Sequence, residues 1–422
     1  MKLPFGPELC HSTGSGGTQA RDSEMSKVMR ALGLMSGTSL DGIDVALITT
    51  DGENVVERGP AMTFPYGEPM RGLLRAAIAD AKGLTARNER PGALPHAERE
   101  LTEHHGAAVS GFLRKQGIAR ETIDVIGFHG QTVLHKHVLN KHITISEPRA
   151  VLDTPRIAAE IKPSTMTVQL GLGEMLAEYT RIPVVYDLRA NDTINGGQGA
   201  PLVPVYHRAL AAKLPQRPLA IVNIGGVANV TWIGRNGDIV AFDTGPGNAL
   251  IDDWVKRKTG ASHDKDGALA SNGQVEEIIV SKYLSGPFFH APGPKSLDRN
   301  AFSLDLLDGL SIEDGAATLS DFTARAIAKA GFLVPERPEL WIICGGGRRN
   351  KMLMAMIAGL VEEAVVPAEA VGFNGDSVEA EAWAYLAVRS LKGLAITFPG
   401  TTGAPKPMTG GVLAKPKSRL FS

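Results

Sequence analysis

The sequence is short of cysteine, of net charge and of long apolar runs, and each shortage excludes a class of protein. Its 422 residues contain two cysteines, Cys10 and Cys344, too few for a disulfide framework, so we expect a reducing compartment. Lys and Arg number 44 and Asp and Glu 45, a balance that argues against a polybasic nucleic-acid surface. No apolar run approaches the ~20 residues that span a bilayer, and the first residues lack the apolar core of a secretory signal. We therefore expect a cytoplasmic protein that binds neither nucleic acid nor membrane.

Glycine, by contrast, is abundant, with 48 residues that gather beside aspartate and small polar residues. Such clusters let the backbone approach a ligand closely. The length is sufficient for two or three domains. Residues 1–28 are rich in Ser, Gly and charge without periodicity, and we expect them to form a disordered N-terminal extension.

A β-meander followed by helices is expected twice along the chain, with a glycine-rich first turn each time. The expected strands are residues 30–36, 43–49 and 54–63 in the first half and 219–225, 230–233 and 238–242 in the second. This duplication predicts an α/β protein of two stacked domains, each a mixed sheet flanked by helices, with a ligand cleft between them. We assign residues 29–168 and about 395–418 to the first domain and residues 169–394 to the second.

Four glycine turns lie at the ends of strand-like runs: Gly37–Gly42, Gly225–Gly226, Asp243–Asn248 and Gly345–Gly347. Polyphosphate binding needs closely approaching backbone N–H groups, hydroxyl donors, a helix N-terminus and a carboxylate for Mg²⁺. Each turn alone is equally well explained as a tight connection, but the four together favour a nucleotide site. The sequence has no P-loop motif and no G-x-G-x-x-G motif after a strand.

Asp187 ends an apolar strand-like run, residues 182–186, and a second glycine-rich segment, Asn195–Leu202, follows it. A carboxylate at such a position can act as a general base on a hydroxyl or on water. Taken alone, Asp187 is somewhat better explained by capping a turn or by pairing with Arg189. Beside a nucleotide cleft, the catalytic interpretation is favoured.

Several of these segments resemble one known family. The sequence Leu32-Gly-Leu-Met-Ser-Gly-Thr-Ser-Leu-Asp-Gly-Ile-Asp44 resembles the first phosphate loop of bacterial anhydro-N-acetylmuramic acid kinases. Further similar blocks follow in family order at residues 127–132, 185–189, 196–204, 223–229, 243–248, 264–266, 344–347 and 375–379. The family belongs to the actin, sugar-kinase and heat-shock-ATPase superfamily, so the resemblance implies the ribonuclease-H-like duplicated kinase fold.

The resemblance implies an ATP- and Mg²⁺-dependent kinase that converts 1,6-anhydro-N-acetylmuramic acid and water to N-acetylmuramic acid 6-phosphate in peptidoglycan recycling, and a homodimer. Asp187 would be the base that activates water. The implied nucleotide-binding residues are Gly37, Thr38, Ser39, Leu40, Asp41, Gly42, Ile43, Asp44, Gly225, Gly226, Asp243, Gly245, Gly345, Gly346 and Gly347, with Mg²⁺ near Asp41 or Asp243. The implied sugar-side residues are His129, Gln131, Arg189 and Glu379.

Two departures from the family pattern bear on the sugar. Where the family usually carries Gln-Ile-Gly-Asp-Gly, this chain has Gln169-Leu-Gly-Leu-Gly173, so that Leu172 replaces an aspartate. The stretch of about residues 135–166 looks inserted, and its periodicity does not choose between a lid, an interface and a passive loop. Two alternatives therefore stay open: a kinase of the same fold for another sugar, and a nucleotide-binding regulatory protein without catalysis.

Overall fold

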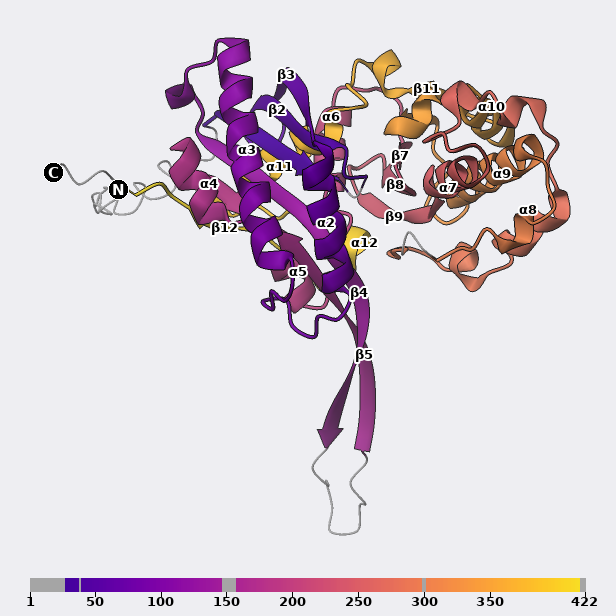
Figure 1. Ribbon diagram of the computed structural model, residues 1–422, viewed down its shortest axis with the longest axis horizontal. Coiled ribbons are helices and arrows are strands. Elements are labelled where there is room, and N and C mark those ends of the chain that lie inside the picture. The colour runs from indigo at the N-terminus through magenta and orange to yellow at the C-terminus, as the bar shows by residue number, and fades with distance from the viewer. Residues whose placement is uncertain (1–26, 38, 146–156, 298–300, 418–422) are drawn as a thin grey trace, which may run out of the picture.

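The structure, a computed structural model, describes residues 27–37, 39–145, 157–297 and 301–417 (Figure 1). Nearly all of the predicted N-terminal extension lies outside these residues, as does Thr38 of the first glycine turn. Among the residues described, no helix has the length and apolar character needed to cross a bilayer. The chain forms two lobes, which Figure 1 shows side by side.

The first lobe is built on a seven-stranded sheet of order β12-β6-β4-β1-β2-β3, with β5 paired to β4. Its strands are β1 (Met29–Ser36), β2 (Gly42–Thr50), β3 (Val56–Pro65), β4 (Val125–Ile145), β5 (Ile157–Leu170), β6 (Val184–Tyr186) and β12 (Val412–Ala414). Its helices are α2 (Glu68–Ala81), α3 (Leu94–Gln116), α4 (Gly173–Thr180), α5 (Ala190–Ile194) and α11 (Val378–Leu391). Apolar residues of α2, α3 and α4 share a buried core with the sheet, so these three helices cover one of its faces.

The second lobe is built on a five-stranded sheet of order β11-β10-β7-β8-β9. Its strands are β7 (Leu219–Ile224), β8 (Val227–Ile233), β9 (Ile239–Pro246), β10 (Leu340–Cys344) and β11 (Ala364–Pro367). Its helices are α6 (Pro204–Ala211), α7 (Ala249–Thr259), α8 (Glu277–Leu284), α9 (Ile312–Ala330), α10 (Lys351–Leu360) and α12 (Pro399–Thr402). Helices α9 and α10 share a buried core with β7, β8 and β10.

The two sheets repeat one strand order, which confirms the predicted duplication. In each lobe an antiparallel meander (β1-β2-β3 or β7-β8-β9) is extended by parallel pairing of its first strand, β1 with β4 and β7 with β10. The predicted α/β class and mixed sheets are therefore present. The carboxyl ends of parallel strands lie at one edge of a sheet, which is where open α/β sheets bind ligands.

Two stretches of the range predicted for the second domain, residues 169–194 with α4, β6 and α5 and helix α11, pack with the first sheet. Strand β6 pairs with β4, because its apolar Val-Val run extends the parallel set of the first lobe. Helix α11 packs on β1, β2 and β4, and it also shares a core with β7 and β10. It therefore lies where the two lobes meet. Asp187, which follows β6, is thus carried by the first lobe.

The stretch predicted to be inserted is the outer part of a long antiparallel hairpin. Strands β4 and β5 pair continuously from Gln131 with Leu170 to Ile145 with Ile157, and residues 146–156 lie outside the described residues. Figure 1 shows the hairpin projecting downward from the first lobe, beyond both lobes. Strand β4 continues far beyond its pairing with β1, because its backbone finds a second partner in β5.

A buried histidine in the second-lobe core makes stability depend on pH. His207 of α6 forms a 2.8 Å hydrogen bond through Nδ1 with Thr231, and burial lowers its pKa to about 3. Below about pH 6.5, His207 therefore binds a proton in the unfolded chain but stays neutral in the folded chain. The free energy of unfolding falls as the pH drops. We expect wild type to lose about 2 kcal/mol from this residue between pH 7 and pH 5. Urea unfolding of His207→Gln should lack that loss, whereas the exposed control His263→Gln should retain it. Equal pH dependence in all three proteins would contradict the assignment.

Candidate functional site

The carboxyl ends of three parallel strands bring first-lobe site residues to one edge. Strand β1 ends at Ser36 beside the first glycine turn, β4 passes through His129 at the same level, and β6 ends just before Asp187. The register pairs Ser36 with Gln131 and Phe128 with Tyr186, so these positions are neighbours across the sheet. Residues that the sequence spreads over about 150 positions therefore share one edge.

The first glycine turn joins β1 to β2 as an acidic hairpin. Leu40 lies in the left-handed region (φ 59°), and its N–H donates to the Gly37 carbonyl. Asp44 lies on β2 and accepts a 2.5 Å hydrogen bond from Thr63. Burial raises the pKa of Asp44, and the charges of Asp376 and Asp41 raise it further. A cation or a hydrogen-bond donor bound at this turn would therefore stabilise the ionised form of the Asp44 carboxylate.

The three glycine turns of the second lobe lie against one another. The N–H groups of Gly247 and Asn248 donate to the carbonyls of Gly226 and Gly225 at 2.9 and 2.7 Å. Gly345 has φ 74°, and a Cβ there would lie 2.3 Å from Oδ1 of Asn223. Only glycine allows so close an approach. The N-terminus of α7 begins directly after these turns, so its dipole favours an anion at this place.

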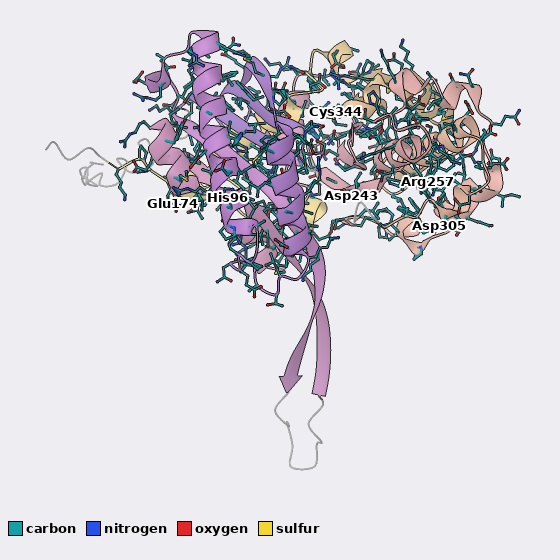
Figure 2. The ribbon with its side chains drawn as sticks, in the orientation of Figure 1. His96, Glu174, Asp243, Arg257, Asp305 and Cys344 are labelled. Carbon is teal, nitrogen blue, oxygen red and sulfur yellow. The ribbon has the colours of Figure 1, made fainter. Side chains whose placement is uncertain are left out.

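Asp243 is held by the segment that follows α8. Its Oδ2 accepts a 2.7 Å hydrogen bond from the Leu297 N–H, and its own N–H donates to the Lys295 carbonyl. Burial raises the pKa of Asp243 to about 7, although the Leu297 hydrogen bond and the Lys295 charge act in the opposite direction. Figure 2 shows Asp243 and Cys344 on the side of the second lobe nearest the first. A bound cation would favour the ionised carboxylate.

Asp187 occupies an unusual backbone conformation for a residue other than glycine. Its φ of 53° puts it in the left-handed region, directly after β6. Such conformations cost free energy and gather at functional sites. Its Oδ1 forms a 2.5 Å ion pair with Nη2 of Arg87, and both side chains are partly exposed. Arg87 comes from the connection between α2 and α3, and nothing in the sequence pattern had singled it out.

The half-buried Arg189 and the buried His129 form a pair close to Asp187 in the chain. The Arg189 Nη2 and Nε lie 3.1 and 3.3 Å from His129 Nε2, and His129 Nδ1 lies 2.8 Å from the Gly130 carbonyl. His129 is therefore neutral with its proton on Nδ1. Burial and the Arg189 charge hold its pKa well below the usual range. Trp383 of α11 stacks on His129 at 4.3 Å and lies under the Arg189 guanidinium. The contacts with His129 and Trp383 thereby fix the orientation of the Arg189 guanidinium.

Gln131 is enclosed within the first lobe. It is fully buried, and its Oε1 accepts a 2.7 Å hydrogen bond from Ser36. The Ser36 hydroxyl also lies 2.9 Å from the Tyr66 hydroxyl. The predicted sugar contact of Gln131 stays a prediction, and the geometry supports a role in positioning the strand end that carries Ser36.

Glu379 joins the two lobes at the start of α11. Its Oε1 accepts a 2.8 Å hydrogen bond from Asn223 of β7. Burial raises the pKa of Glu379, the Asp44 charge adds to this, and Arg189 opposes it. First-lobe and second-lobe charges therefore act on one carboxylate. Asn223 was not singled out from the sequence, since an asparagine at the end of a strand is common.

Leu172 is the N-cap residue of α4, and its side chain cannot cap the helix. Its φ of −95° and ψ of 90° are extended, and no side-chain hydrogen bond is made. The Glu98 carboxylate and the Thr102 hydroxyl of α3 accept from the Gly171 and Leu172 N–H groups, which precede the first turn of the helix. We expect Leu172→Asp to stabilise the protein by about 1 kcal/mol, because aspartate accepts from the first-turn N–H groups. Chemical denaturation would measure this, and Leu172→Ala should bring no such gain.

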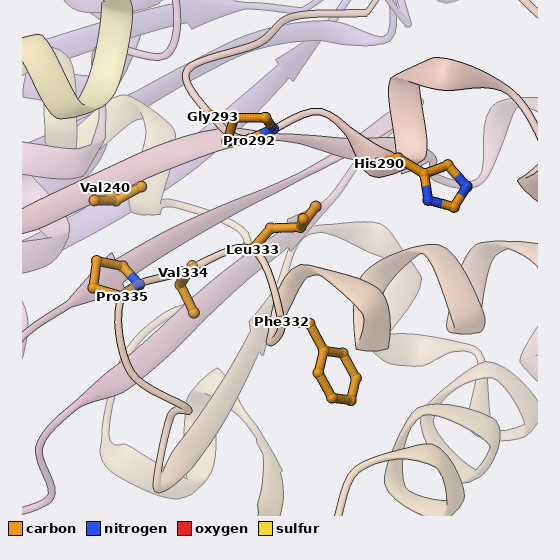
Figure 3. Close-up of a pocket in the computed structure, with 8 residues that line it drawn as sticks. All are labelled: Val240, His290, Pro292, Gly293, Phe332, Leu333, Val334 and Pro335. Atoms are coloured by element: carbon orange, nitrogen blue, oxygen red, sulfur yellow. The ribbon is translucent and has the colours of Figure 1, made fainter.

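A surface pocket in the second lobe lies apart from these residues. Figure 3 shows it lined by Val240, His290, Pro292, Gly293, Phe332, Leu333, Val334 and Pro335. Val240 is near the start of β9, whereas Asp243 is nearer its end. No residue predicted for the site lines this pocket. We therefore take the strand ends of the first lobe, together with the glycine turns of both lobes, as the candidate site.

The residues present suit a metal ion held mainly by phosphates. Within the described ranges, no three His, Cys, Asp or Glu side chains gather as a ready metal site. Mg²⁺ in kinases is commonly held by one or two carboxylates together with water and substrate phosphates. Asp243, beside the glycine turns, fits such a role, and Asp41 is exposed on the first turn.

Comparison with known proteins gives one consistent result. The family model described as anhydro-N-acetylmuramic acid kinase matches residues 29–416. Similar proteins named anhydro-N-acetylmuramic acid kinase include that of Azorhizobium caulinodans, 53% identical over 395 residues, and that of Rhizobium etli, 50% identical over 395 residues. The matches cover 92% and 93% of this chain and all of each relative.

Solved structures resemble the chain more distantly. An activator of 2-hydroxyisocaproyl-CoA dehydratase from Clostridium difficile with bound ADPNP is 14% identical, with a TM-score of 0.41 over 86% of this chain and 96% of that one. A ROK family glucokinase from Streptomyces griseus in complex with glucose and AMPPNP is 14% identical, with a TM-score of 0.32 over 85% and 98%.

Proposed function

The chain belongs to the family of anhydro-N-acetylmuramic acid kinases, and from this membership we propose that Asp187 is its general base and that the glycine turns hold ATP. The activity is ATP-dependent conversion of 1,6-anhydro-N-acetylmuramic acid and water to N-acetylmuramic acid 6-phosphate, a step in peptidoglycan recycling. The observation that carries the proposal is the place of Asp187, strained at the carboxyl end of β6 on the edge shared with the first glycine turn.

The reaction breaks one sugar bond and transfers one phosphoryl group. Asp187 takes a proton from water, and the water oxygen bonds to the anomeric carbon. The bond from that carbon to the bridging O6 breaks, and O6 takes the γ-phosphoryl group while ADP leaves. One carboxylate serves the hydrolytic half, whereas phosphoryl transfer needs positioning and charge stabilisation.

The nucleotide site is proposed to combine both lobes. The backbone around Gly225–Gly226 and Gly345–Gly347 and the N-terminus of α7 would face the phosphates, with the Gly37–Asp44 turn on the opposite side. Mg²⁺, proposed to be held near Asp243 or Asp41, would supply charge neutralisation on the phosphates. Arg189 and Glu379 are proposed to contact the sugar, with His129 and Gln131 beside them.

The proposal is tested by ADP release with the anhydro sugar, ATP and Mg²⁺ in ¹⁸O-water, with mass spectrometry of the product. We expect a phosphorylated sugar that carries one solvent oxygen at its anomeric carbon. A phosphorylated product without solvent oxygen would favour a simple kinase, and ATP binding without ADP release would favour a silent nucleotide-binding protein. We also propose that the protein is cytoplasmic and that it forms a homodimer. Light scattering would test the homodimer by its molar mass.

A further inference from the structure

Arg87 forms a short contact with the proposed base. Its Nη2 lies 2.5 Å from Asp187 Oδ1, although the two residues are 100 positions apart. The Arg87 side chain is 37% exposed and the Asp187 side chain 23%, so both remain partly accessible from solvent. In this arrangement the Arg87 guanidinium is hydrogen-bonded to the carboxylate that is proposed to take a proton from water.

The ion pair with Asp187 leaves one hydrogen-bond donor of Arg87 without an acceptor. Its Nε is buried and has no hydrogen-bond partner among the residues that the structure describes. A buried N–H without an acceptor is costly, and a guanidinium is suited to a planar acceptor that takes two of its donors. The position therefore favours a second oxygen acceptor.

The α2–α3 connection that carries Arg87 is firmly attached at several points. Arg90 forms a two-point ion pair with the largely buried Glu98 of α3, at 2.8 and 3.0 Å. Lys136 of β4 donates to the Leu84 carbonyl at 2.6 Å, and Asp80 accepts from the Ala93 N–H at 2.8 Å. Arg87 is thus presented by an ordered loop, and it has a definite direction toward the end of β6.

We propose that Arg87 is the receptor for the lactyl carboxylate of the substrate, and that this carboxylate takes the guanidinium away from Asp187. This inference rests on the proposed function. Muramic acid differs from glucosamine by an ether-linked lactic acid, so its carboxylate is the one anionic group of the anhydro sugar. Arg87 would then pair with the substrate, and Asp187 would be released to activate water. The ion pair thereby couples the freeing of the base to recognition of a muramic rather than a glucosamine sugar.

The test measures sugar binding without ATP, by calorimetry, so that turnover is not needed. The two probes are 1,6-anhydro-N-acetylmuramic acid and 1,6-anhydro-N-acetylglucosamine, which lacks the carboxylate. We expect Arg87→Gln to weaken binding of the first roughly 10- to 100-fold and to leave binding of the second unchanged or tighter. Arg87→Lys should recover part of the affinity, because it restores the charge without the planar fork. The matched control is Arg75→Gln, which removes an exposed ion pair with Glu68 on α2.

Asp187→Asn provides the complementary variant. It removes the anion that competes for Arg87, so it should bind the muramic sugar more tightly than wild type. Equal weakening of both sugars by Arg87→Gln would overturn the inference, because Arg87 would then only order the site. Unchanged binding of both would also overturn it. If wild type bound neither sugar, the proposed function would fail as well, whereas wild-type turnover with unselective Arg87→Gln binding would leave that function standing.

Discussion

Asp187→Asn is expected to lower kcat for the anhydro sugar by about 10²–10⁴-fold, the usual contribution of a positioned general base. Asparagine keeps the size of the side chain but cannot accept the proton of water. The fold should persist, because the Asp187 side chain is partly exposed and packs at a strand end. ADP release under saturating ATP measures the effect, and nucleotide binding should remain close to that of wild type.

The control for this substitution is Asp305→Asn, at an exposed carboxylate of the second lobe that Figure 2 shows far from Asp243. It should retain the full kcat. If Asp187→Asn kept more than about a tenth of wild-type kcat, the base would have to be another group. Glu379 would be the next candidate, since it is the carboxylate that joins both lobes.

Gly33→Ala is expected to destabilise the protein by about 3 kcal/mol or more, a large effect for one methyl group. Gly33 lies in the middle of β1 beneath α11, and a Cβ there would lie 1.7 Å from the Ala380 carbonyl oxygen and 2.7 Å from the Ala384 nitrogen. Both are backbone atoms of the helix, so no side-chain rotation relieves the collision. The helix must move off the sheet, and Glu379 would move with it. Urea unfolding followed by circular dichroism would measure the loss.

Gly72→Ala is the matched control, because it makes the same chemical change where nothing lies within 4 Å of the added Cβ. Gly72 is exposed within α2, and alanine is the better helix former, so the control should gain about 0.5–1 kcal/mol. If the two variants had equal stability, the close approach of α11 to β1 would be wrong.

Much of the fold follows from local sequence pattern. Alternating and continuous apolar runs predicted β1, β2 and β7 to within about two residues of their bounds, and α7 and α11 start where small polar turns end. The hairpin of β4 and β5 was not predicted. Its strands are held by each other over a long distance, and such pairing leaves no periodic signal against a core.

The candidate site likewise contains residues that the sequence pattern indicates and one that it does not. Asp187 and the glycine turns could be recognised from the sequence, because a carboxylate after an apolar strand and glycine beside aspartate are local features. Arg87 could not, since it lies among other polar residues of the α2–α3 connection. Its importance arises only from its contact with Asp187.

By itself, the sequence determined the two meanders, the family and the residue types that chemistry requires, because each depends on neighbours within a short stretch of chain. Tertiary structure alone decided that β6 joins the first sheet, that α11 closes on Gly33, and that Arg87 meets Asp187. These contacts join residues from about 60 to 350 positions apart, and their free energy depends on packing and burial that form only when the whole chain has folded.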